Sequence, residues 1–121
     1  MDRTFSLAEA RTVLADMRPA LDELIEVRAD LATRAHRHNR GETVPIPDIK
    51  ALEARMGELL DGVRARGVQV KGYAPLLLDF PMEVGDGTVL LCWLEGDDDI
   101  AWFHEPELGF MGRRPLADLD R

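Results

Sequence analysis

Apolar residues in the first half of the chain recur at alternating spacings of three and four, which is the periodicity of an α-helix. One such stripe spans residues 7–35, and a second, very regular one spans residues 49–63. Ser6 and Glu9 have the spacing of a capping box, which predicts a helix start at this point. The connecting residues 40–47 contain a glycine and two prolines, so two helices of similar length are predicted to form an antiparallel hairpin.

Pro19 interrupts the first of these stripes. A proline inside a helix removes a hydrogen bond and clashes with the preceding turn, at a cost of about 3 kcal/mol, whereas it is well tolerated at the start of a helix. The sequence therefore predicts a short helix near residues 7–17 and a long helix from about 19 to 39, joined by a kink or a tight break.

The periodicity changes after Gly67 to short apolar runs bounded by turn residues, which is typical of β-strands. Four runs qualify, at residues 68–72, 76–80, 88–94 and 100–104, and Pro81 is expected to end the second because it cannot donate to a ladder. Short turns between strands require antiparallel neighbours. A single α+β domain is predicted. Its helical half, residues 1–67, contains a kinked N-terminal helix and an antiparallel helical hairpin. These helices are expected to pack on the second half, residues 68–121, which forms a three- to four-stranded antiparallel meander.

The run at residues 88–94 is apolar on both of its faces, because alternate side chains point to opposite sides of a strand. A sheet of this kind needs cover on both sides. The helical hairpin can cover one side, and the first helix, the tail at residues 109–116 or a second subunit must cover the other. A homodimer is therefore one of the predicted arrangements.

Charge is distributed unevenly along the 121 residues, whose net charge is −8. Residues 1–67 carry twelve acids and eleven bases, whereas residues 68–121 carry eleven acids and four bases. Phosphate backbones and anionic membranes attract clustered Lys and Arg, so no nucleic-acid partner and no membrane partner is predicted. No apolar segment resembling a secretory signal opens the sequence, and Cys92 is the single cysteine, which together predict a cytoplasmic protein.

Four polar residues of the second half form the candidate site: Asp79, His104, Glu105 and Arg113. A histidine with two carboxylates can bind a divalent metal or act as a base and an acid. The spacing matches no metal-binding motif, so no metal site and no cofactor is predicted. The alternative is structural: Asp79 accepts turn amides or pairs with an arginine, and His104 caps its strand beside Glu105.

Three further features contain residues that can bind a ligand or react. His36 and His38 lie two residues apart near a helix end and point to different sides, so they are expected to be solvated. Cys92 has no neighbouring histidine in the sequence to activate it, and a buried thiol is usually inert. The basic tail at residues 109–115 can hold an anion, or it can fold back to pair with the acidic turn at residues 97–99.

Several segments together resemble a family of small bacterial proteins that is catalogued only as a domain of unknown function. They are GVQVKG at residues 67–72, LDFP at 78–81, LCW at 91–93 and GFxGRxP at 109–115. The resemblance covers nearly the whole chain and implies a bacterial, cytoplasmic, single-domain protein. No activity is known for the family, so no catalytic role is carried over to these residues.

Two classes of function remain. The first is a non-catalytic module for protein interaction or self-association, which presents the helical hairpin or an apolar sheet face to a second copy or to another protein. The alternative is a small enzyme or a metal- or anion-binding protein with a site around His104, Asp79 and Arg113. The absence of a catalytic signature in the sequence favours the first.

Overall fold

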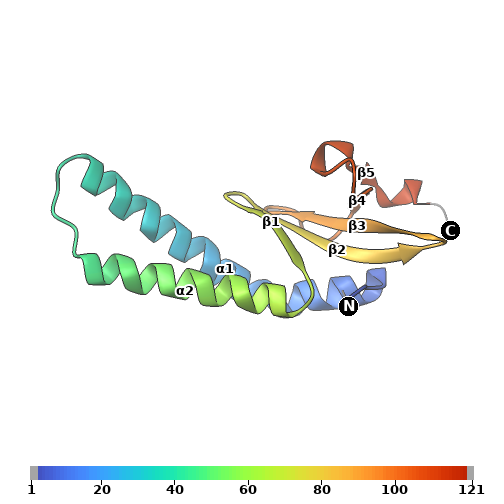
Figure 1. Ribbon diagram of the computed structural model, residues 1–121, viewed down its shortest axis with the longest axis horizontal. Helices are drawn as coiled ribbons and strands as arrows, with labels where there is room; N and C mark the ends of the chain where they lie inside the picture. Colours follow the sequence, from blue (N-terminus) through green and yellow to red (C-terminus); the bar gives the residue numbers. More distant parts are fainter. Residues whose placement is uncertain (1–2, 120–121) are drawn as a thin grey trace. The chain divides into compact units, whose positions relative to one another are not determined.

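Two helices are followed by a five-stranded antiparallel sheet in the computed structural model, which describes residues 3–119 (Figure 1). The predicted α+β class is therefore confirmed. Consecutive strands are neighbours throughout, in the order β1-β2-β3-β4-β5, as in a meander. The elements are α1 (Leu7–Asn39), α2 (Ile46–Ala65), β1 (Gln69–Tyr73), β2 (Leu76–Val84), β3 (Gly87–Leu94), β4 (Trp102–His104), η1 (Phe110–Gly112), β5 (Arg114–Pro115) and η2 (Leu116–Asp118).

The chain divides into two compact units. One contains the residues up to 16 and from 63 onward, and the other contains residues 17–62. This division differs from the predicted helical and sheet halves, because the first turns of α1 belong with the sheet. The second unit is the hairpin of α1 and α2, where the Arg55 guanidinium donates to both carboxylate oxygens of Glu23, at 2.5 and 2.7 Å.

Pro19 lies inside α1, which is one continuous helix, so the predicted tight break at this residue is wrong, and the alternative of a kink stays a prediction. The amide that proline lacks would have bonded to the carbonyl of Ala15, four residues earlier. Both residues are exposed, so water can satisfy that carbonyl and the helix continues. The predicted capping box is confirmed: the Glu9 amide donates to Ser6 Oγ at 3.0 Å, and the Ser6 amide donates to Glu9 Oε1 at 2.8 Å.

β2 continues through Pro81 to Val84, so the predicted strand end at Pro81 is also wrong. Pro81 pairs with Leu90 of β3, and its carbonyl accepts a hydrogen bond from the Phe5 amide at 2.7 Å on the other edge of the strand. In a β-strand the amide and the carbonyl of one residue point the same way. The amide that proline lacks therefore faces away from β3, and the ladder loses no hydrogen bond.

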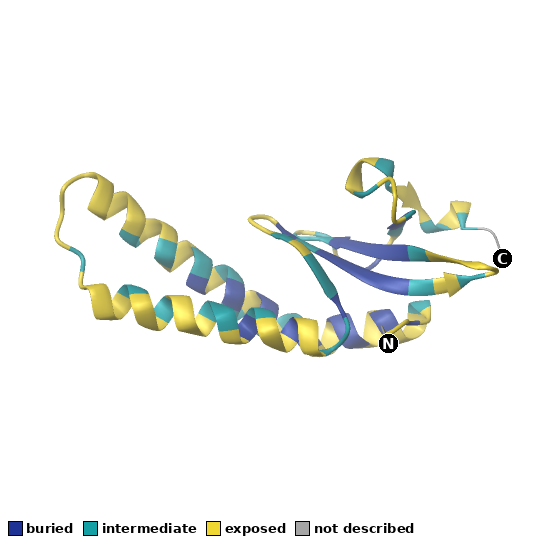
Figure 2. Cartoon of the chain, in the orientation of Figure 1, coloured by how far each residue is buried: buried dark blue, intermediate teal, exposed yellow. Residues whose placement is uncertain are grey.

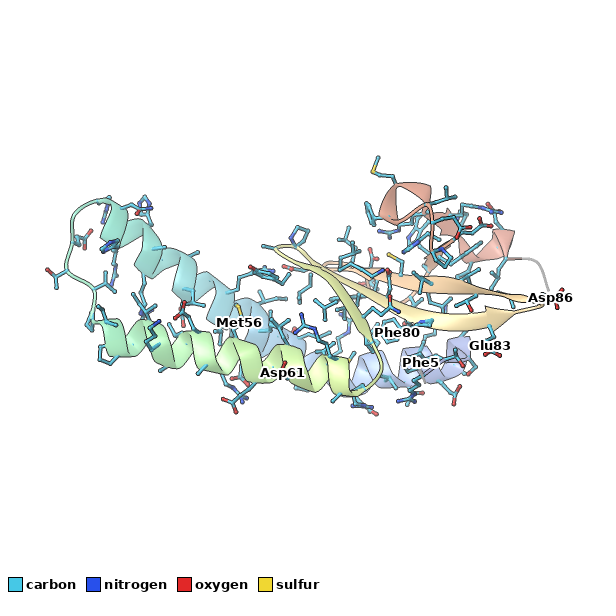
Figure 3. All side chains as sticks on the ribbon, in the orientation of Figure 1. Phe5, Met56, Asp61, Phe80, Glu83 and Asp86 are labelled. Atoms are coloured by element: carbon cyan, nitrogen blue, oxygen red, sulfur yellow. The ribbon has the colours of Figure 1, made fainter. Side chains whose placement is uncertain are left out.

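The two faces of the sheet are covered by different segments of the same unit (Figure 1). On one face, Phe5 and Phe80 meet edge to face with ring centroids 5.5 Å apart, next to the first turns of α1 (Figure 3). On the other face lies the tail that follows β4, where the Arg113 guanidinium stacks 4.7 Å from the Trp102 ring. Part of this tail pairs with β4 as β5, which adds a fifth strand to the three or four predicted.

Candidate functional site

Strand register places Asp79, Cys92 and His104 on one face of the sheet. Asp79 of β2 pairs directly with Cys92 of β3, and Cys92 pairs with Trp102 of β4. Residues two apart on a strand share a face, so His104 lies on the same side as Cys92. We call Asp79, Cys92 and His104 the buried cluster, because Asp79 is 1 % exposed, His104 is 2 % exposed and Cys92 is fully buried.

Hydrogen bonds join His104 to groups on both sides of its ring. Nε2 lies 3.0 Å from Asp79 Oδ2, and Nδ1 lies 3.0 Å from the carbonyl oxygen of Glu105. A carbonyl oxygen only accepts, so this contact requires a proton on Nδ1. The ring is thereby fixed in orientation, and its other nitrogen, Nε2, points into the cluster.

A second cation reaches the same carboxylate. The Lys71 ammonium donates to Asp79 Oδ2 at 3.1 Å, and the Lys71 side chain is 43 % exposed. Sequence reasoning missed Lys71, because only the pairing of β1 with β2 brings this side chain to Asp79. The register of β1 against β2 shifts between Val70 and Gly72, and Lys71 lies at this irregularity.

The two oxygens of Asp79 have different surroundings. Oδ2 accepts from His104 and from Lys71, whereas Oδ1 is buried and meets no hydrogen-bond partner within the described part of the chain. A buried carboxylate oxygen without a donor is costly, and native structures contain few such atoms. The cluster therefore has an acceptor position that the chain itself does not use.

Cys92 completes the cluster as a protonated thiol. Burial raises the pKa of its thiol to about 12, and the nearby Asp79 carboxylate contributes to the increase. A thiol with this pKa holds its proton throughout the neutral range, and the thiolate is the reactive form.

We expect Cys92 to resist alkylation in the folded protein. At pH 8 iodoacetamide should leave it unmodified for hours in buffer and label it fully in denaturant, because burial blocks both ionisation and access. Mass spectrometry of the intact chain measures the labelled fraction. Rapid labelling of the folded chain would show that the strand around Cys92 opens frequently.

The other two predicted site residues do not join the cluster with their side chains. Glu105 contributes its backbone carbonyl instead of its carboxylate. Arg113 donates to Asp97 Oδ2 at 3.0 Å and lies over the rings of Trp102 and Phe110. The predicted folding of the basic tail onto the acidic turn is confirmed by this pair.

A pocket of about 260 Å³ is lined by two residues that contact or pair with members of the buried cluster. Its lining includes Lys71, the side chain that bonds to Asp79, and Leu90, which pairs with His104 across β3 and β4. Gln69 and Pro106 also line it. Lys71 therefore contacts both this pocket, as one of its lining residues, and the carboxylate of Asp79, through its ammonium group.

The model of the family described as Uncharacterized conserved protein (DUF2203) matches residues 3–116, so the chain belongs to that family. No curated protein and no solved structure matches the chain. Within residues 3–119, no helix is both long enough and apolar enough to cross a membrane.

Proposed function

We propose that this member of the uncharacterized family is a self-associating module, whose helical hairpin pairs with the hairpin of a second copy. The observation that carries the proposal is the lack of burial in the outer hairpin, which we define as residues 28–58. None of these 31 consecutive residues is buried, although most of them lie in the two helices (Figure 2). The compact unit to which they belong, residues 17–62, has its buried apolar side chains outside this stretch, at Met17, Leu21, Leu24, Val27 and Leu59.

Apolar side chains are nevertheless present in the outer hairpin. Leu31, Leu52 and Met56 are only half-buried, and Ile46 is 66 % exposed. Two antiparallel helices share one seam and cannot enclose it, whereas four helices surround a common core. The association of two hairpins into a four-helix bundle would cover these side chains. The tail covers the second face of the sheet (Figure 1), so we do not place the dimer contact on that face.

The charges of the hairpin favour a second copy as the partner. Residues 17–62 carry nine acids and seven bases, a net charge of −2, so two hairpins repel each other weakly. The charges on α1 are also divided along its length: residues 22–30 carry four acids and one arginine, whereas residues 34–40 carry three arginines and no acid. An antiparallel pair of α1 helices places each acidic half beside the basic half of its partner.

Charge reversal at Glu26 and Arg37 tests this arrangement. Both side chains are exposed and lie three helical turns apart, so they do not interact within one helix. Glu26→Arg or Arg37→Glu should each weaken dimerisation about 5-fold, because a dimer with two-fold symmetry loses two exposed pairs. The double variant should recover the wild-type dissociation constant. Analytical ultracentrifugation over a concentration series measures all four proteins.

Asp86, at the tip of the β2–β3 hairpin, provides the matched control. Asp86 is exposed and lies far along the chain from the outer hairpin. Asp86→Arg therefore changes the net charge by the same amount as Glu26→Arg but leaves the residues of the proposed contact unchanged. Its dissociation constant should equal that of the wild type. A double variant that dimerises no better than the single variants would contradict the antiparallel arrangement, and a wild-type chain that stays monomeric would contradict self-association.

A further inference from the structure

The buried cluster has the composition and the spacing of a metal centre. One carboxylate oxygen of Asp79, Sγ of Cys92 and a ring nitrogen of His104 all lie within 4.8 Å of one another. They come from three adjacent strands, so the backbone ladder holds their positions. The sequence predicted no metal site, because ligands that meet across strands leave no short spacing motif.

The donor set selects the kind of ion. A thiolate sulfur and an imidazole nitrogen are ligands that Zn²⁺ binds well, and it accepts a carboxylate oxygen as a third ligand. Mg²⁺ and Ca²⁺ prefer oxygen ligands and are poorly served by this set. We propose that Asp79, Cys92 and His104 bind a divalent transition-metal ion of the zinc type.

Two further observations fit a metal ion. A histidine that binds a metal usually donates its second ring N–H to a carbonyl or a carboxylate, and His104 Nδ1 meets the Glu105 carbonyl in this way. Asp79 Oδ1 is buried and has no hydrogen-bond partner in residues 3–119. A cation bound beside it would satisfy this oxygen.

The charges of the cluster also fit the proposal. The Lys71 ammonium competes with the metal ion for the Asp79 carboxylate. Binding releases the Cys92 thiol proton and the His104 Nε2 proton that Asp79 accepts, and His104 keeps its proton on Nδ1. An Asp79 carboxylate, a thiolate and a neutral imidazole then surround a divalent cation, which makes a neutral site. The Lys71 ammonium is then no longer needed as a counter-charge at Asp79 Oδ2. Because its side chain is 43 % exposed and lines a pocket, Lys71 can move into solvent when the ion binds.

Cobalt absorption tests the site in the full-length chain. The protein is treated with a chelator and a thiol reductant, freed of both, and titrated with Co²⁺. We expect saturation at one equivalent, with an intense thiolate-to-cobalt charge-transfer band and the visible bands of a tetrahedral ion. Added Zn²⁺ should then remove both signals. A folded wild-type chain that shows no thiolate-to-cobalt band would overturn the proposal.

Three variants distinguish the buried cluster from metal bound at the surface. His36→Ala/His38→Ala removes two exposed histidines and should leave the titration unchanged. Cys92→Ser should abolish the charge-transfer band and weaken Zn²⁺ binding at least 10-fold, as expected when a ligand is lost. Lys71→Met should tighten Zn²⁺ binding up to about 5-fold, the value of one half-exposed ion pair.

These titrations distinguish metal bound at the surface from metal bound in the buried cluster. Loss of binding in the double histidine variant would assign the metal to the surface and overturn the proposal. If Cys92→Ser fails to fold, X-ray absorption of the zinc-loaded wild type replaces it. A mixed sulfur, nitrogen and oxygen shell supports the cluster, and a shell without sulfur overturns it.

Discussion

Replacing His104 with alanine is expected to lower the free energy of unfolding by about 3–5 kcal/mol in metal-free buffer, the usual cost of removing one partner of a buried ion pair. His104 is 2 % exposed and Asp79 is 1 % exposed, and their side chains are 3.0 Å apart. Without the imidazole, the Asp79 carboxylate stays buried with Lys71 as its remaining donor. Urea denaturation followed by circular dichroism measures the change.

Glu105→Ala is the matched control for this experiment. It alters the next residue but keeps the backbone carbonyl that accepts from His104, so its cost should stay within about 0.5 kcal/mol. Asp79→Ala/His104→Ala should cost less than the sum of the two single changes, because the partners act together. Additive costs, or an unchanged stability in His104→Ala, would show that the pair contributes nothing to folding.

Phe80→Ala should also lower the free energy of unfolding by about 3–5 kcal/mol, the range for a buried phenylalanine. The ring is fully buried in β2 and contacts Phe5 edge to face. Its removal leaves a cavity between the N-terminal segment and the sheet. The fluorescence of Trp93 in β3 and Trp102 in β4, the two tryptophans of the chain, reports the loss during denaturation.

Leu52→Ala provides the comparison from the outer hairpin. Leu52 is half-buried in a stretch without buried residues, so its replacement should cost the monomer about 1 kcal/mol. The midpoint of the denaturation curve followed by tryptophan fluorescence should barely change in this variant. Equal losses for Phe80→Ala and Leu52→Ala would mean that the outer hairpin is as well packed as the sheet, contrary to the burial pattern.

Local patterns were sufficient to predict the elements of this fold. The helical stripes, the turn residues and the alternation after Gly67 each act over a few residues, and they predicted both helices and the first four strands. Both errors in these elements concern proline. Pro19 was expected to kink or break the first helix, and Pro81 was expected to end its strand. The helix and the strand both continue, because the position of the missing amide faces water at Pro19 and an outer strand edge at Pro81, which depends on tertiary position.

The candidate site was predicted only in part, because strand pairing decides which side chains meet. Asp79 and His104 were both identified, but 25 residues separate them in the sequence, and their contact depends on the register of three strands. Cys92 was considered inert because no histidine lies near it in the sequence. The pairing of β3 with β4 supplies His104, and an irregularity in β1 supplies Lys71, a residue that no pattern indicated.

Native mass spectrometry of the untagged chain tests self-association most directly. The chain has a mass of 13.6 kDa. We predict a dominant species with the mass of two chains at micromolar concentration. On dilution, the dimer of Glu26→Arg should dissociate at a higher protein concentration than the wild-type dimer. A species with the mass of one chain at every concentration would contradict the account, and the outer hairpin would then need a different partner to cover its apolar residues.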